Sequence, residues 1–149
     1  MDNDWLAIRA VVDGIDDAVD AKNWAKARAY FTTEIDVDFA ALEGGPPTTM
    51  PADSLIAAWQ RNLYADKLSF HQRTNHDIAV QEDRATVVSK GYAFNRLDRA
   101  LGDALWEVWA FYKHELVRTD DGWRCSAIAV SEVVHARGNE LARTYIPSS

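Results

Sequence analysis

The hydrophobic period of the chain changes once, at about Leu68, and this change limits the folds that are open to it. Before Leu68, apolar residues recur at every third or fourth position, as on one face of an amphipathic helix. After it, apolar and polar residues alternate, as they do in half-buried strands. Helices followed by an antiparallel sheet predict an α+β domain, in which the helices pack on one face of the sheet.

The first part of the chain is expected to form three helices and one strand. The expected helices span residues 3–21, 24–29 and 49–63, and a strand over residues 35–39 lies between the last two. Asn23 is a suitable cap for the second helix. Thr49 is a suitable cap for the third helix, because Pro51 then falls in the first turn, where proline is tolerated.

The second part of the chain is expected to form an antiparallel sheet. Its predicted strands span residues 70–81, 84–97, 104–118 and 123–137, and the first of them is interrupted near Thr74 and Asn75. The sequence Asp120-Asp121-Gly122 is a turn signal that joins the last two strands as a hairpin.

Both faces of the predicted sheet are apolar, whereas a face left to water would be polar at alternate positions. In the strand over residues 104–118, one face holds Trp106, Val108, Ala110 and Tyr112, and the other holds Leu105, Trp109 and Phe111. The helices cover one face. A second copy of the chain is the economical cover for the other, so we expect a homodimer or homotrimer that forms through the outer sheet face.

Length, charge and cysteine content restrict the possible partners. The 149 residues fit one domain over residues 1–149, and their net charge of −7 repels nucleic-acid backbones. The single cysteine, Cys125, excludes an internal disulfide. No apolar run is long enough to span a membrane, and the acidic N-terminus does not look like a signal peptide. We therefore expect a cytoplasmic protein that binds neither nucleic acid nor membranes.

Four aspartates lie on one side of the first predicted helix: Asp13, Asp16, Asp17 and Asp20. Such a run is typical of a solvated face, and a helical wheel directs none of the four into a cavity. Asp20 differs in one respect. It falls in the last helical turn, where the helix dipole disfavours a carboxylate by about 0.3–1 kcal/mol.

The four histidines, at positions 71, 76, 114 and 135, do not have the spacing of a metal site, so no metal is expected. His76 and His114 have charged neighbours in the sequence and are expected to face solvent. His71 lies among polar residues on a predicted strand, and by itself it is interpreted as a structural histidine.

Three segments resemble known enzymes. Residues 19–24 and 35–39 are similar to the first part of scytalone dehydratase, and His71-Gln72-Arg73-Thr74-Asn75 is similar to the His-x-x-Thr-Asn segment of hexachlorocyclohexane dehydrochlorinase. The hairpin over residues 112–123 is shared with both. Together with the order of helices and strands, these segments make the whole chain resemble the SnoaL-like branch of the nuclear-transport-factor-two-like superfamily.

The resemblance implies a cone-shaped domain, in which a curved, mixed or antiparallel sheet carries three N-terminal helices on its concave face. In the relatives, an Asp at the end of the first helix and a His on the second strand form a dyad inside the cone. The matching residues here are Asp20 and His71. In this role the carboxylate holds one ring nitrogen of the histidine while the other removes a proton, and no cofactor is needed.

The resemblance and the strand parity also predict a substrate pocket. Its expected residues are Val19, Trp24, Phe39, Asn95, Trp106, Val108, Tyr112, Ile128, Val130 and Glu132. Several of them depart from the relatives: Val19 and Phe39 stand where the dehydratase has tyrosines, Asn95 stands near its second histidine, and Ile128 matches a cationic residue of the dehydrochlorinase. The base of the relatives is thus retained, whereas the acid that would assist a leaving group is not.

Tyr112, Asn95 and Glu132 are candidate replacements for that acid, because strand parity can direct them inward. The leading hypothesis is a dehydratase-like lyase or an isomerase that acts on a small apolar, aromatic or polycyclic substrate. The alternatives are a binding or assembly module without activity and a polyketide cyclase-like enzyme.

Overall fold

The computed structural model describes residues 2–98 and 102–148. Their helices and strands are α1 (Asp2–Asp20), α2 (Trp24–Ala29), β1 (Phe31–Asp38), α3 (Ala40–Glu43), β2 (Thr48–Pro51), α4 (Ala52–Asn62), β3 (Leu68–Gln81), β4 (Arg84–Arg96), β5 (Leu105–Thr119), β6 (Gly122–Gly138) and α5 (Glu140–Thr144). The six strands form one sheet in the order β2-β1-β6-β5-β4-β3. The predicted α+β class is confirmed, and the sheet is mixed because β1 pairs parallel to β6.

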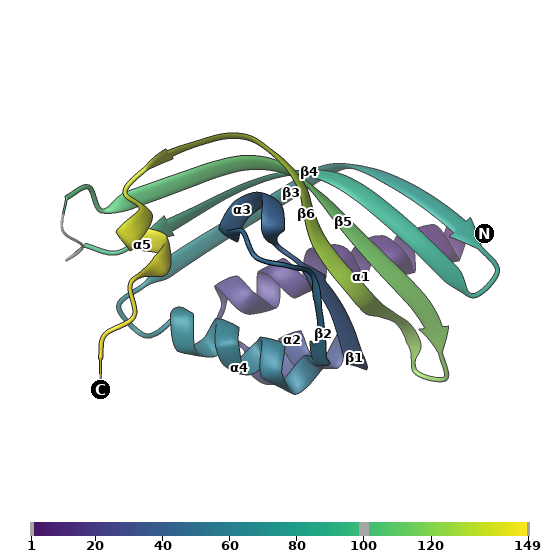
Figure 1. Cartoon of the computed structure of the whole chain (residues 1–149). Helices are drawn as coiled ribbons and strands as arrows, with labels where there is room; N and C mark the ends of the chain where they lie inside the picture. The colour runs from purple at the N-terminus through teal and green to yellow at the C-terminus, as the bar shows by residue number, and fades with distance from the viewer. Residues whose placement is uncertain (1, 99–101, 149) are drawn as a thin grey trace.

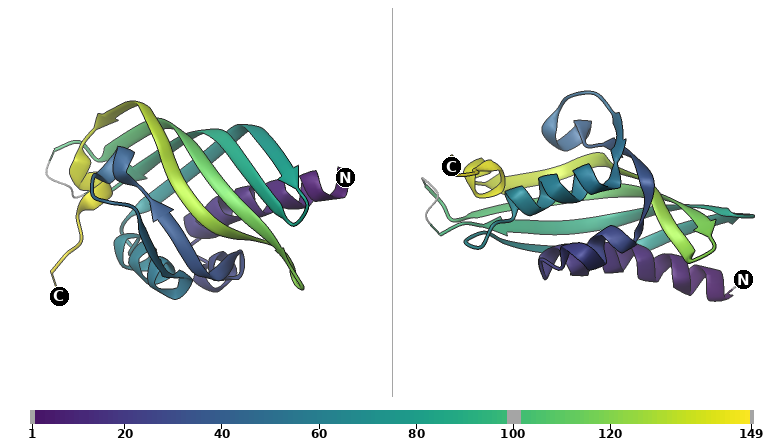
Figure 2. Two further views of the ribbon diagram at one scale, coloured as in Figure 1. Left: turned by 45° about the vertical axis from the view of Figure 1, so that its right-hand side comes forward. Right: turned by 90° about the horizontal axis from the view of Figure 1, so that it is seen from below.

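The long strands β3 to β6 arch over α1, α2 and α4, which all lie on one side of the sheet (Figures 1 and 2). The amphipathic spacing in α1 explains this placement. Ile8, Val12, Ile15 and Val19 recur at intervals of three and four and are all buried against the sheet. Among the described residues, no helix is long and apolar enough to cross a membrane.

Three elements differ from the sequence-based expectation. Thr48–Pro51 is a short strand, β2, that pairs with β1, so Thr49 does not cap a helix and α4 begins at Ala52. The other two are short helices, α3 and α5, for which four and five residues give too little periodicity to be recognised.

Helix α5 lies at one end of the sheet, next to β4 and β5 (Figure 1). The chain reverses at Gly138, where φ is 100°, a left-handed value that favours glycine. A Cβ atom there would also collide with the backbone of Leu105. Asn139 then caps α5, because its side chain accepts a hydrogen bond from the backbone of Leu141. The C-terminal segment is thereby folded back over the end of the sheet.

The sheet face opposite the helices carries aromatic side chains. Tyr92 packs on Trp109, which stacks on His135, and Phe70 stacks on Phe94. The side chains of Phe70, Val88 and Val134 are exposed to solvent in the single chain.

Candidate functional site

Helix α1 and strand β3 are joined by three pairs of acidic and basic side chains. The pairs are Asp20–His71, Asp16–Arg73 and Asp13–His76. Their alignment follows from geometry: four residues of helix rise about 6 Å, close to the roughly 6.6 Å that two residues of strand span. The helix face that was expected to be solvated therefore faces the sheet with three of its four aspartates, and only Asp17 is exposed.

A β-bulge lets the third pair form. The register of β3 against β4 shifts between Thr74 and Asp77, and Asn75 has a left-handed φ of 55°. The bulge inverts the strand parity, so His76 points inward. Its side chain is only 5% exposed, and the expectation that it faces solvent is therefore wrong.

His76 also forms a hydrogen bond with Ser89, and 2.6 Å separate its Nδ1 from the hydroxyl oxygen. Its Nε2 lies 2.9 Å from Asp13. Ser, His and Asp thus meet as in a hydrolase, but Ser89 is fully buried and lines none of the four main cavities of the described residues. These contacts are structural.

Asp20 holds His71 through two hydrogen bonds and is itself held by a third, from Ser69. Its Oδ1 lies 2.7 Å from Nδ1 of His71, and its Oδ2 accepts the backbone N–H of the same residue at 2.7 Å. Ser69 donates its hydroxyl to Oδ1, also at 2.7 Å. The carboxylate accepts all three bonds, which requires the proton of the neutral imidazole to sit on Nδ1. Nε2 is then the ring nitrogen left free to accept a proton.

Arg73 and Asp16 form the central pair, and both are almost completely buried, with side chains 6% and 10% exposed. Nη2 of Arg73 donates to Oδ1 of Asp16 at 3.1 Å, and Nε contacts Oδ2. Burial alone would raise the pKa of Asp16, but the charge of Arg73 outweighs it and the pKa falls. Burial likewise opposes the charge of Arg73, and Asp16 more than compensates by raising its pKa. Both groups are therefore charged.

Tyr112 packs against Arg73 of this pair. Its ring centre lies 3.8 Å from the guanidinium carbon of Arg73, which is a cation–π contact. Gly91 on the neighbouring strand makes room for it, because a Cβ atom there would collide with the ring of Tyr112. Burial raises the pKa of the Tyr112 hydroxyl, so this group stays protonated and can donate a hydrogen bond.

His114 lies beneath the same cluster and is fully buried, so the expectation that it faces solvent is also wrong. Neither ring nitrogen has a hydrogen-bond partner among the described residues. Burial, reinforced by the nearby charge of Arg73, lowers its pKa to about 3. His114 is therefore neutral, and it does not line the cavity that His71 and Arg73 reach.

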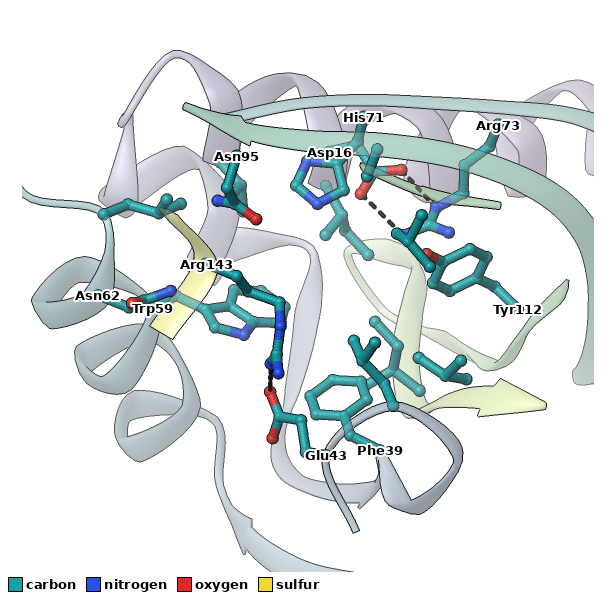
Figure 3. A pocket seen from close by; sticks show the side chains of 18 of the residues that line it. Asp16, Phe39, Glu43, Trp59, Asn62, His71, Arg73, Asn95, Tyr112 and Arg143 are labelled. Carbon is teal, nitrogen blue, oxygen red and sulfur yellow. Dashed lines mark hydrogen bonds and ion pairs between the residues drawn. The ribbon is translucent and has the colours of Figure 1, made fainter. Parts of the chain in front are cut away.

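His71, Arg73 and Tyr112 line a cavity of about 160 Å³ that is partly open to solvent; Figure 3 shows how their side chains lie in it. Eight of the ten residues expected in the pocket line it: Val19, Phe39, Asn95, Trp106, Val108, Tyr112, Ile128 and Val130. Asp20 does not line the cavity and lies behind His71. Asn95 reaches in beside His71 from the adjacent strand (Figure 3).

Two residues expected in the pocket lie elsewhere. Trp24 packs against the core between the helices. Glu132 is exposed and pairs with Phe111 on the outer face. The reason for the second error is a bulge at Ser131: Phe111 pairs with Glu132 while Tyr112 pairs with Val130, so parity is lost after Val130.

The mouth of the cavity is formed by residues that the sequence did not single out. Arg143 of α5 and Glu43 of α3 face each other there, with 3.6 Å between Nη1 and Oε1 (Figure 3). Trp59 and Asn62 of α4 complete the rim. Arg143 lies in a segment without clear periodicity, and no local pattern pointed to it.

A family model of the SnoaL-like domain matches residues 3–129, most of the chain. The chain belongs to this family. The predicted resemblance is thereby confirmed. No match was found among curated proteins.

Solved structures share the fold of this SnoaL-like domain. The Kfla4162 protein from Kribbella flavida is 29% identical, with a TM-score of 0.89 over 96% of this chain and 99% of that one. A candidate scytalone dehydratase from Novosphingobium aromaticivorans is 16% identical, with a TM-score of 0.76 over 100% of this chain and 95% of that one. A type 2 hexachlorocyclohexane dehydrochlorinase is 18% identical, with a TM-score of 0.69 over 92% of each chain. At such identities the last two show the fold alone.

The site of this SnoaL-like domain combines an oriented imidazole with hydrogen-bond donors across a small cavity. The walls are mostly apolar, from Phe39, Trp106 and Val108, which limits the water around a bound ligand. Such an arrangement can move a proton from a ligand atom to Nε2 of His71 and can donate a hydrogen bond from Tyr112.

Proposed function

We propose that this SnoaL-like domain is a lyase, in which His71 removes a proton from carbon and a leaving group departs from the adjacent carbon. The observation that carries the proposal is the 2.7 Å contact between Asp20 and Nδ1 of His71, at the wall of an open cavity. A histidine held in this way has a fixed tautomer and a basic nitrogen directed to the ligand. Asp20 is the positioning residue and His71 is the base.

Each proton and electron pair of the elimination has a destination. Nε2 of His71 takes the proton, the C–H electron pair becomes the second bond between the two carbons, and the bond to the leaving group breaks. A chloride departs with its electron pair and needs no proton. A hydroxide needs one to leave as water, and Tyr112 supplies it. After loss of water the proton on His71 returns to Tyr112 through solvent, and after loss of chloride it passes to solvent.

The cavity size favours a substrate of one ring over a polycyclic one. Its volume of about 160 Å³ is similar to that of an apolar cavity of about 150 Å³ that holds benzene. Asn95 and Arg73 offer N–H groups to a carbonyl oxygen of such a ring, which would stabilise the charge that develops when the adjacent carbon loses its proton.

A non-catalytic binding module does not need the Asp20–His71 contact, which is why the enzyme is preferred. Isomerisation and cyclisation begin with the same proton removal and differ from elimination in their later steps. They are outcomes of the same assay, since their products differ from those of elimination.

The test is an elimination assay with one-ring ketones that carry a hydroxyl or a chlorine two carbons from the carbonyl. The variants are His71→Gln and Asp20→Asn, with His135→Gln as the matched control, because His135 lies on the opposite sheet face. We expect losses of about 10²–10⁴-fold in kcat/KM for the first two and none for the control. Unchanged turnover in both site variants would overturn the proposal.

A further inference from the structure

Arg143 at the mouth of the cavity is held more firmly than a surface arginine. Its backbone carbonyl accepts a hydrogen bond from Nζ of Lys67 at 2.9 Å. The same ammonium donates to the carbonyl of Tyr145 and to Oδ1 of Asn62, each also at 2.9 Å. Lys67 is fully buried, so these three bonds tie α5 to the end of α4 and fix the backbone from which Arg143 projects.

The guanidinium of Arg143 is oriented as well. Nη2 and Nε both donate to Glu140, at 2.7 and 3.2 Å. The guanidinium carbon lies 5.0 Å from the ring centre of Trp106, a wall of the cavity. The side chain is only 17% exposed. Two donor atoms are thus used by Glu140, and Nη1 remains on the cavity side (Figure 3).

Glu43 is a weak partner for Nη1. The 3.6 Å between the two atoms is too long for a good hydrogen bond. The Glu43 side chain is 54% exposed, and exposed ion pairs contribute little. An incoming anion with better geometry can therefore displace Glu43.

We propose that Arg143 binds a carboxylate of the substrate, so that the substrate class is a one-ring carboxylic acid. The ring occupies the apolar cavity, its carboxylate replaces Glu43 at Nη1, and the reactive carbon faces His71. The inference rests on the proposed function only in taking this cavity as the substrate site. Arg143 suits this role better than Arg73, because the charge of Arg73 is balanced by Asp16, which is buried with it, whereas the acidic partners of Arg143, Glu43 and Glu140, are exposed.

Charge distribution supports this assignment. The pairs Asp16–Arg73 and Asp20–His71 balance their own charges within the wall. At the mouth, the positive charges of Arg143 and Lys67 face the negative charges of Glu140 and Glu43, so a carboxylate that displaces Glu43 leaves the local charge balance unchanged. A charge-assisted bond in a partly buried site is stronger than a neutral one. The affinity should weaken as salt is added, because the mouth is open to solvent.

The test measures binding of benzoate and of benzamide by calorimetry, in the full chain and in the variants Arg143→Gln, Glu43→Gln and Arg96→Gln. Benzamide has the same shape without the charge. Arg96 is an exposed arginine paired with Asp98 and away from the cavity, so its variant is the matched control.

We expect Arg143→Gln to weaken benzoate binding at least tenfold and to leave benzamide binding unchanged. Glu43→Gln should strengthen benzoate binding several-fold, because a competing carboxylate is lost. This variant keeps the test valid if Arg143→Gln disturbs α5, since Glu43 is exposed and its replacement does not affect the fold. Equal affinities for benzoate and benzamide, or affinities that neither variant changes, would overturn the inference.

The measurement separates this inference from the lyase proposal. Benzoate has no leaving group, so its binding requires no turnover and should persist in His71→Gln. If benzoate binding depends on Arg143 but no elimination is found, the inference stands and the lyase proposal fails. If neutral ketones are turned over and Arg143→Gln does not change the affinity for benzoate, the lyase proposal stands and the inference fails.

Discussion

Arg73 of β3 and Asp16 of α1 form an ion pair buried between helix and sheet, one helical turn from the pair of Asp20 and His71. The two pairs share one spacing, so the contact that holds the helix against the strand also sets where the imidazole stands. Stability and the position of the base are thus coupled through neighbouring turns of α1.

Removing either member of the buried pair should destabilise the domain by about 3–5 kcal/mol, because an uncompensated charge would remain buried. The variants are Asp16→Leu and Arg73→Met, measured by urea unfolding. The double variant should recover most of the loss, since two apolar side chains leave no charge behind. Asp98→Asn is the control, because its ion pair with Arg96 is exposed. Equal stability of wild type and both single variants would contradict the assignment.

His114 should make the stability depend on pH. Its pKa is about 3 in the folded chain, against an ordinary value of 6.5, so between these values the unfolded chain binds the extra proton. The part of the free energy of unfolding that depends on His114 is fully present above pH 6.5. It is lost as the pH falls toward 3, with a slope of up to about 1.4 kcal/mol per pH unit. Arg73, Asp16 and His76 are the charged or titratable groups that influence it.

His114→Leu should remove this part of the slope, and at pH 7 it should change the free energy of unfolding little, because neither ring nitrogen is hydrogen-bonded to a described residue. The measurement is urea unfolding of both proteins at pH 7 and pH 4.5. The difference in stability between the two pH values should be smaller in the variant. Identical pH profiles would show that His114 is not buried in its neutral form.

Tyr112→Phe should lower kcat for substrates that lose hydroxide more than for substrates that lose chloride. If Tyr112 gives a proton to a departing hydroxide, the variant loses about 10²-fold or more in kcat on a hydroxy ketone. A chloro ketone needs no such proton, so its kcat should change little. Steady-state kinetics on a matched pair of substrates measures both. Equal losses on the two substrates would remove Tyr112 from the proton-donor role.

The fold followed from the sequence because the change of period near Leu68 is strong and each long strand alternates cleanly. Parity failed where bulges occur. The interruption near Asn75 was expected from the sequence, but not that it would invert the parity and turn His76 inward. The bulge at Ser131 turned Glu132 outward, and no glycine or proline there indicates it. Alternation predicts which sheet face a side chain lies on only while the strand is regular. One extra residue at a bulge moves every later side chain to the opposite face.

The candidate site was predicted only in part, for a different reason. Asp20 and His71 were found through a resemblance, whereas Asp16 and Arg73 were missed because charged residues are exposed by default. The alternation of His71 and Arg73 on one strand face was the available signal. Arg143 and Glu43 come together only through tertiary contacts at the cavity mouth, and no local pattern carries that information.

The outer sheet face leads to a prediction about assembly. Trp109, Phe70 and Val134 form part of an apolar surface, and we propose that a second copy of the chain covers it. Light scattering should give a dimer or trimer for the wild type and a smaller species for Trp109→Glu. Trp5→Glu, at an exposed position on α1, is the control. A monomeric wild type at micromolar concentration would contradict the proposal.

The most direct test of the central claim is deuterium exchange at carbon, which needs no leaving group. One-ring ketones are incubated with the domain in D₂O, and deuterium next to the carbonyl is followed by NMR. We predict catalysed exchange by the wild type and by Glu132→Gln, and none above background by His71→Gln. Exchange by His71→Gln at the wild-type rate, or none by the wild type with ketones that bind, would contradict the claim that His71 is a base acting on carbon.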